Sequence, residues 1–112
     1  MDKTEFIEKY KTANGNVDMN RVDSILRRSL SPESEKFEGF TNLIIAMEEF
    51  AECQQEVSKV LRDKGDLANL LQETADAYIS IRYIQLICKI SDEDLNKAIN
   101  VKIDRQAERV EL

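Results

Sequence analysis

The amino-acid sequence predicts an all-α protein built around a helical hairpin. Three observations carry this prediction. Apolar residues recur every three or four positions along most of the chain, and only three glycines and one proline interrupt it. A short turn containing glycine also separates two long segments with this apolar periodicity. Because an all-β architecture needs more turn residues, we expect the 112 residues to form a single helical domain, residues 1–112.

The composition restricts the class of protein. Apolar residues make up 42% and charged residues 34%, which is typical of a folded, soluble chain. The net charge of −6 disfavours general binding to the backbone of nucleic acid. No apolar run has the length of a signal peptide core or a membrane span. We therefore expect a cytoplasmic protein that binds neither nucleic acid nor membrane.

The residue types that are scarce exclude several kinds of site. The chain has no histidine, which excludes catalytic triads that use histidine as the base and zinc sites that contain it. Two cysteines are too few for a zinc site made of four thiolates. Any chemistry must therefore come from carboxylates, amines, hydroxyls or a hard metal ion.

The first 30 residues predict two short helices. The first 18 residues favour a short helix that ends in the turn signal NGNVD. Residues 19–30 then place a set of apolar residues on one helical face. This set is Met19, Val22, Ile25, Leu26 and Leu30.

A long helix is expected over residues 34–61. The stretch SPES predicts its start, because Ser31 is a candidate N-cap and Pro32 suits the first helical position. Gly39 is expected to bend or delay this helix. Its apolar residues recur at intervals of three and four: Phe37, Phe40, Leu43, Ile44, Met47, Ala51, Val57 and Leu61.

The turn RDKGD joins this helix to a second long helix over residues 67–90. We expect Gly65 to be the C-cap of the first helix and Asp66 the N-cap of the second. The second helix is apolar on nearly every face, which predicts burial on every side. In so short a chain a partner subunit is one route to that burial. We therefore expect a homodimer or homotetramer whose hairpins pack as a four-helix bundle.

The last helix is expected to begin at SDED. Ser91 is the candidate N-cap, and Asp94 stands three residues later, in the position of a capping box. The apolar residues of this helix are Leu95, Ala98, Ile99, Ile103 and Val110.

Two pairs of acidic residues stand at helical spacing on the two long helices. Glu49 and Glu52 are three residues apart and share one face of the first helix. Glu73 and Asp76 have the same spacing in the otherwise apolar second helix. The first pair lies about ten residues before the turn and the second about eight after it, so the pairs differ in level by roughly 3 Å. An antiparallel hairpin therefore brings the four carboxylates together.

Four carboxylates offer hard oxygen ligands. Such a set suits Mg²⁺, or Mn²⁺, better than zinc or copper. Protein-bound Mg²⁺ is usually completed by water and by substrate phosphates, so the set implies a phosphorylated substrate. The chemistry that fits is the attack of metal-activated water on a phosphoanhydride.

Each acidic pair also has a purely structural interpretation. Glu49 and Glu52 could line a solvated helix face, as runs of charge usually do. Glu56 continues the same stripe, and we expect it to be solvated. The second pair could instead form salt bridges, for which the candidate cations are Arg62, Lys64 and Arg82.

The pattern EExxE, followed at a distance by ExxD, resembles the all-α nucleoside triphosphate pyrophosphohydrolases of the MazG-like family. Here the two parts are EEFAE at residues 48–52 and ETAD at residues 73–76. Residues 34–110 form the MazG-like core of this resemblance, and residues 1–30 lie outside it. The resemblance implies Mg²⁺-dependent hydrolysis of a nucleoside or deoxynucleoside triphosphate to the monophosphate and pyrophosphate.

The resemblance also implies roles for individual residues. Glu48 and Glu52 would be catalytic, with Glu48 orienting the site or helping to activate water. The last helix would supply amide and basic residues to the phosphates, and its basic residues equally suit ion pairs with acids one turn away. The implied metal ligands are Glu49, Glu52, Glu73 and Asp76, and the implied phosphate contacts are Asn100, Lys102 and Arg105.

A rival hypothesis is a non-catalytic helical module for protein interaction or oligomerisation. Its acids would be a surface charge pattern, and its apolar helix would be a docking face. The position of Glu73 and Asp76 separates the two hypotheses, because a docking helix has no reason to carry two carboxylates among apolar residues. Those neighbours are Leu70, Ala75, Ala77 and Ile79.

Overall fold

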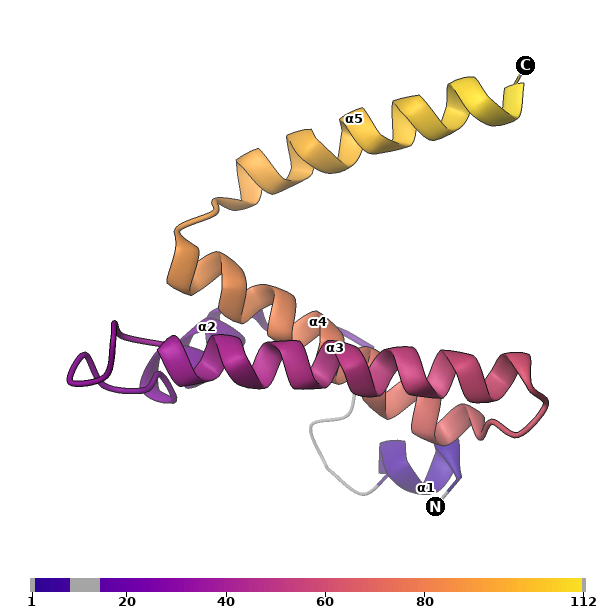
Figure 1. The fold of residues 1–112 in the computed structure, drawn as a ribbon, viewed down its shortest axis with the longest axis horizontal. Helices are drawn as coiled ribbons and strands as arrows, with labels where there is room; N and C mark the ends of the chain where they lie inside the picture. The colour runs from indigo at the N-terminus through magenta and orange to yellow at the C-terminus, as the bar shows by residue number, and fades with distance from the viewer. Residues whose placement is uncertain (1, 9–14, 112) are drawn as a thin grey trace.

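The computed structural model describes residues 2–8 and 15–111, and within these ranges helices joined by turns and loops make up the structure, with no strand (Figure 1). The all-α prediction is therefore confirmed. None of the helices in these ranges is both long and apolar enough to cross a membrane. The helices are α1 (Lys3–Glu8), α2 (Met19–Arg28), α3 (Phe40–Leu61), α4 (Leu67–Cys88) and α5 (Asp92–Glu111).

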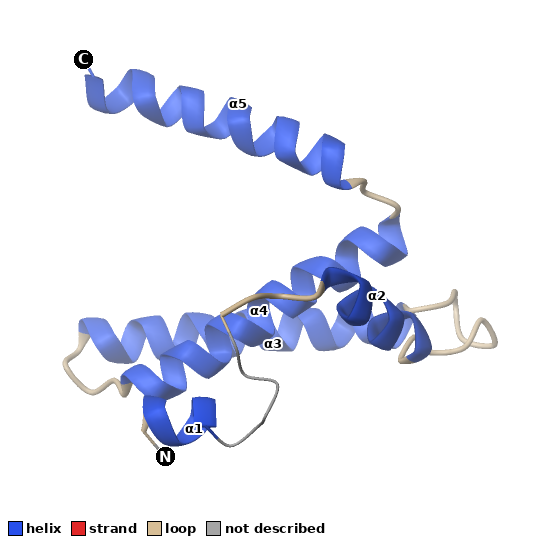
Figure 2. Ribbon diagram, turned by 180° about the vertical axis from the view of Figure 1, so that it is seen from behind, coloured by secondary structure: helices blue, strands red, loops and turns tan. Residues whose placement is uncertain are grey.

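The centre of the molecule is the hairpin of α3 and α4, which pack against each other along their length. Helices α1 and α2 also pack on α4, on the side away from α3 (Figure 2). Both views show α5 leading away from the hairpin. The predicted hairpin is thus present, and α4 is its central helix.

The two predicted N-terminal helices are present in part. Helix α1 covers Lys3–Glu8 of the first 18 residues, and residues 9–14 of that prediction lie outside the described ranges. Helix α2 matches the predicted segment closely. The Asp18 carboxylate caps it by accepting a hydrogen bond from the backbone N–H of Arg21 at 3.1 Å. The face of α2 toward α4 buries Leu26.

The predicted start of the long helix near residue 34 is wrong, because α3 begins at Phe40. Gly39 delays it, with a left-handed φ of 89° that residues with a side chain rarely adopt. A Cβ atom at Gly39 would also lie 2.7 Å from Cγ1 of Ile87 on α4.

The N-cap role predicted for Ser31 and the helical position predicted for Pro32 are also wrong, because the N-cap of α3 is Gly39 and neither residue is helical. The Oγ of Ser31 still accepts a hydrogen bond from the backbone N–H of Thr41 in the first turn of α3 at 3.2 Å.

The turn between α3 and α4 confirms one predicted cap and corrects the other. The Asp66 carboxylate accepts from the backbone N–H of Ala68 at 2.8 Å, as an N-cap does. The C-cap role predicted for Gly65 is wrong: the C-cap is Arg62, and the left-handed residue of the turn is Asp63, with φ 60°.

The turn between α4 and α5 confirms the predicted N-cap of the last helix. Lys89 ends α4 in the left-handed conformation, with φ 58°. Ser91 then caps α5, because its Oγ accepts from the backbone N–H of Asp94 at 3.0 Å.

The expectation that the second long helix is buried on every side is wrong for a single chain. Leu71, Tyr78 and Ile79 of α4 are exposed. The surface area is 8975 Å², whereas a compact monomer of this size exposes about 6,300 Å². In the described ranges the buried apolar residues are Leu26, Ala46 and Ala68.

Candidate metal centre

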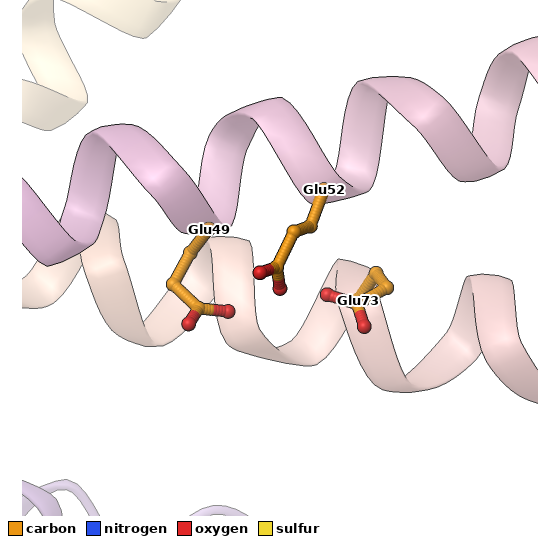
Figure 3. A group of neighbouring side chains, drawn as sticks. All are labelled: Glu49, Glu52 and Glu73. Carbon is orange, nitrogen blue, oxygen red and sulfur yellow. The ribbon is translucent and has the colours of Figure 1, made fainter.

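Three carboxylates meet in the gap between the two long helices. Glu49 and Glu52 point from α3 toward α4, where they converge with Glu73 (Figure 3). One oxygen from each lies within 4.8 Å of the others. We call these three residues the acidic cluster. The hairpin brings them level because each stands a similar number of residues from the turn, as the sequence predicts.

Two of these carboxylates are poorly compensated. Glu49 and Glu73 are half-buried, and Oε2 of each is buried without a hydrogen-bond partner. Among the described residues, no ion pair joins the cluster to a lysine or arginine. A buried carboxylate without a partner is costly, so the arrangement favours either a proton or a cation in the gap.

The pKa values of Glu49 and Glu73 reflect the same lack of compensation. Burial raises the pKa of Glu49 above its ordinary 4.5, and the negative charges of Asp76, Glu52 and Glu73 raise it further. Burial likewise raises the pKa of Glu73, and the charges of Glu52, Asp76 and Glu56 add to that effect. A divalent cation bound there would reverse these effects by favouring the charged forms.

Asp76 lies beside the acidic cluster. It is outside the group of three oxygens, but its charge acts on both Glu49 and Glu73. The helical spacing from Glu73 accounts for this position, since residues three apart are neighbours on a helix. Negative charges from both acidic pairs thus raise the pKa of Glu49 and of Glu73.

The structural interpretations of the two pairs do not account for this geometry. Arg82, a candidate salt-bridge partner, pairs with Asp23 and Asp92 instead. No ion pair of the described residues includes Glu73 or Asp76. On the other pair, Glu52 is exposed as a solvated face requires, whereas Glu49 is half-buried.

The negative charge of Glu56 also raises the pKa of Glu73, although we predicted from the sequence that Glu56 is solvated. Its side chain is 12% exposed, and its Oε2 is buried without a hydrogen-bond partner. Its Oε1 pairs with Nζ of Lys59 at 3.0 Å. The signal that could have identified it is spacing, because residues 49, 52 and 56 follow one face of a helix.

The other candidate residues are not members of the acidic cluster. Glu48 is exposed and is not a member of the group of three. Asn100, Lys102 and Arg105 are exposed on α5, which leads away from the hairpin (Figures 1 and 2). A single chain therefore does not bring the predicted phosphate contacts to the cluster.

A comparison of the chain with models of protein families, with curated proteins and with solved structures finds no match. The resemblance to MazG-like enzymes therefore stays a prediction that rests on EExxE and ExxD. The donor set itself is informative, because it contains oxygen ligands only and includes two buried oxygens without partners. These properties fit a hard divalent cation such as Mg²⁺.

Proposed function

We propose that the acidic cluster binds Mg²⁺, or Mn²⁺, and that the protein hydrolyses nucleoside triphosphates to the monophosphate and pyrophosphate. The observation that carries this proposal is the convergence of Glu49, Glu52 and Glu73 without a compensating cation among the described residues. Asp76 would complete the ligand set. Mg²⁺ held by carboxylates usually retains free positions, which substrate phosphates occupy.

The reaction follows from these groups. When bound, Mg²⁺ supplies positive charge that offsets the charge of the phosphates and makes water more acidic. The water oxygen forms a bond to one phosphorus of the α–β anhydride, and the bond from that phosphorus to the bridging oxygen breaks. Attack at the α-phosphorus expels pyrophosphate and attack at the β-phosphorus expels the monophosphate, so the products are the same. Glu52, the exposed member of the cluster, would accept the proton of the attacking water, and Glu48 would assist it. Lys102 and Arg105 would bind the phosphates.

We infer that a second copy of the chain completes the site. The chain exposes roughly 2,700 Å² more surface than a compact monomer of its size would. This excess is comparable to the area that each chain buries in an obligate dimer, and the two hairpins would then pack as a four-helix bundle. Since α5 leads away from its own hairpin, its Lys102 and Arg105 would contact phosphates at the cluster of the partner copy.

The test of activity uses a panel of nucleoside and deoxynucleoside triphosphates with Mg²⁺, and it measures monophosphate and pyrophosphate separately. We expect hydrolysis of at least one triphosphate. Loss of one ligand should lower kcat/KM by about 100-fold or more, as loss of charge stabilisation in a transition state does. The variants are Glu49→Gln, Glu52→Gln, Glu73→Gln and Asp76→Asn. The control Glu33→Gln alters an exposed acid of the segment before α3 and should not change the rate.

Two outcomes would contradict the activity. One is the absence of turnover on every triphosphate tested. The other is equal turnover by the wild type and Glu52→Gln. Either would favour the non-catalytic interaction module, for which the exposed apolar residues of α4 would be the docking surface.

Mixing two inactive variants tests whether each site is built from the acidic cluster of one copy and α5 of the other. Glu73→Gln removes a metal ligand, and Arg105→Gln removes a phosphate contact. If each site combines the cluster of one copy with α5 of the other, a mixed dimer contains one site without either substitution. We expect co-refolded variants to recover a substantial part of the activity that each lacks alone. A mixture as inactive as its components would show that each chain builds its site alone.

A further inference from the structure

Arg82, near the C-terminal end of α4, joins three helices. Its guanidinium binds Asp23 of α2 through two parallel contacts, with Nε to Oδ1 and Nη2 to Oδ2 both at 2.7 Å. Its remaining terminal nitrogen, Nη1, donates to Oδ1 of Asp92 in the first turn of α5 at 2.6 Å. The Arg82 side chain is only 15% exposed. The planar guanidinium therefore holds both carboxylates in fixed directions.

Gln85 adds a second link at the same place. It is buried, and its Nε2 donates to Oδ1 of Asp92 at 3.0 Å and to the backbone oxygen of Ile90 at 3.4 Å. The backbone N–H of Ile90 donates in turn to the backbone oxygen of Gln85 at 3.0 Å. The start of α5 is thus bonded to α4 by side chains as well as by the chain itself. We call Asp23, Arg82, Gln85 and Asp92 the Arg82 cluster.

The direction of α5 depends on few other contacts. Figures 1 and 2 both show α5 leading away from the hairpin after the turn at Lys89. In the described part of the chain, the ion pair that joins α5 to another helix is Arg82–Asp92. The other ion pair of α5, between Lys97 and Glu93, stays within the helix. Within one chain, the turn at Lys89 would be the main restraint on the direction of α5 if the Arg82 cluster were lost.

We propose that Arg82 is a positioning residue that, together with Asp23, Gln85 and Asp92, fixes the direction of α5 and so the location of Lys102 and Arg105. The claim about direction rests on the contacts alone. The effect on phosphate binding rests on the proposed function. The charge of Arg82 is paired with Asp23 and Asp92 and not with the acidic cluster.

The direction of α5 can be measured by electron spin resonance between two spin labels. The labels are placed at the exposed positions Gln55→Cys on α3 and Glu108→Cys on α5, in a chain whose Cys53 and Cys88 are replaced by alanine. Dilution with an excess of unlabelled chain leaves the distance within one chain as the dominant signal. We expect one narrow distance distribution when the Arg82 cluster is intact.

Asp92→Ala is the decisive variant, because Asp92 is largely exposed and its loss should leave the hairpin folded. It removes the contacts from Arg82 and Gln85 to α5, so we expect a broad distance distribution. Glu93→Ala is the matched control. It removes an acid from the same helical turn and the ion pair with Lys97, but no link to α4. Its distribution should stay narrow. Arg82→Lys keeps the charge without the planar guanidinium, so its distribution should be of intermediate width.

The kinetic constants of Asp92→Ala are a second measurement. If the Arg82 cluster only stabilised the fold, KM would not rise selectively. We expect Asp92→Ala to raise KM for the triphosphate at least tenfold while kcat falls by less, because the acidic cluster is intact. Narrow distributions in both Asp92→Ala and Arg82→Lys would overturn the proposal. A broad distribution with an unchanged KM would refute the link to phosphate binding. A broad distribution in a chain that hydrolyses no nucleotide would support the positioning role and refute the proposed function.

Discussion

At the scale of single residues, Glu49 and Glu73 contribute to how stability depends on pH. Burial and neighbouring acids raise the pKa of both above the ordinary 4.5. The folded chain therefore binds more protons than the unfolded chain just above that pH, and the free energy of unfolding falls as pH rises through this window.

Asp23 has the opposite effect on how stability depends on pH. The hydrogen bonds from Arg82 lower its pKa below 3.8, so its contribution to stability is lost as pH falls below that value.

Glu73→Gln should therefore stabilise the metal-free protein at pH 7. The substitution removes a half-buried charge that lacks a partner, which is worth roughly 1 kcal/mol and shifts the Tm by about 3–6 °C upward in a chain of this size. The difference should shrink as pH approaches 4.5, because the wild-type carboxyl then becomes protonated. Thermal unfolding in a chelating buffer at several pH values measures this. A lower Tm for Glu73→Gln at pH 7 would mean that Glu73 forms a stabilising ion pair.

Mg²⁺ should reverse the order of the Tm values, so that the wild type becomes more stable than Glu73→Gln. A cation that binds the folded chain and not the unfolded chain raises the Tm of the wild type. Glu73→Gln lacks one ligand, so its Tm should respond much less at the same Mg²⁺ concentration. Lys59→Gln is a useful control, because it removes the partner of Glu56 and leaves the acidic cluster in place. An equal rise in Tm for the wild type and Glu73→Gln would show that Mg²⁺ binds elsewhere.

At the scale of helices, what the sequence could predict was local. The hairpin and the level of its acids follow from apolar periodicity and from a turn of a few residues. The start of α3 does not follow from these patterns. It depends on the close approach of the backbone at Gly39 to Ile87 of α4, which is far away in the sequence. The direction of α5 depends on the pairing of Arg82 with Asp23 and Asp92, which no periodicity encodes. Contacts between segments far apart in sequence thus determine the start of α3 and the direction of α5, which apolar periodicity does not predict.

Gly39→Ala tests the account of how α3 begins. The left-handed backbone at Gly39 disfavours any side chain, and the added Cβ would lie 2.7 Å from Ile87. We expect a loss of about 1–3 kcal/mol in the free energy of unfolding. Gly15→Ala is the matched control, since a Cβ there meets nothing within 4 Å. Urea unfolding of the two variants compares them directly. Equal stabilities would contradict the proposed role of Gly39.

At the scale of the whole molecule, the chain exposes more surface than a compact monomer of its size, and many of its large apolar side chains are exposed. Its radius of gyration is 16.7 Å, against about 13 Å for a compact domain of this length. This is also why the sequence could identify the acidic pairs but not the site around them. The pairs lie within one hairpin, whereas in our proposal the phosphate contacts on α5 meet a cluster only after two copies associate.

Charge placed on the exposed apolar surface of α4 should weaken this association. Tyr78 is 72% exposed in the single chain, and we expect Tyr78→Asp to shift the protein toward monomer in sedimentation velocity experiments. Val17→Asp is the matched control. Val17 is similarly exposed, at 74%, but lies outside the hairpin, so its substitution should leave the size unchanged. A wild-type protein that sediments as a monomer at all concentrations would contradict the assembled site.

Measuring the binding of Mg²⁺ is the most direct test of whether the acidic cluster is a metal site, and it requires no knowledge of the substrate. Isothermal titration of the chelator-treated protein with Mg²⁺ should give saturable binding that Glu33→Gln retains and that Glu49→Gln and Glu73→Gln each weaken at least tenfold. If the wild type and these two variants bind Mg²⁺ equally, or if none binds it, the carboxylates between α3 and α4 do not form a metal site.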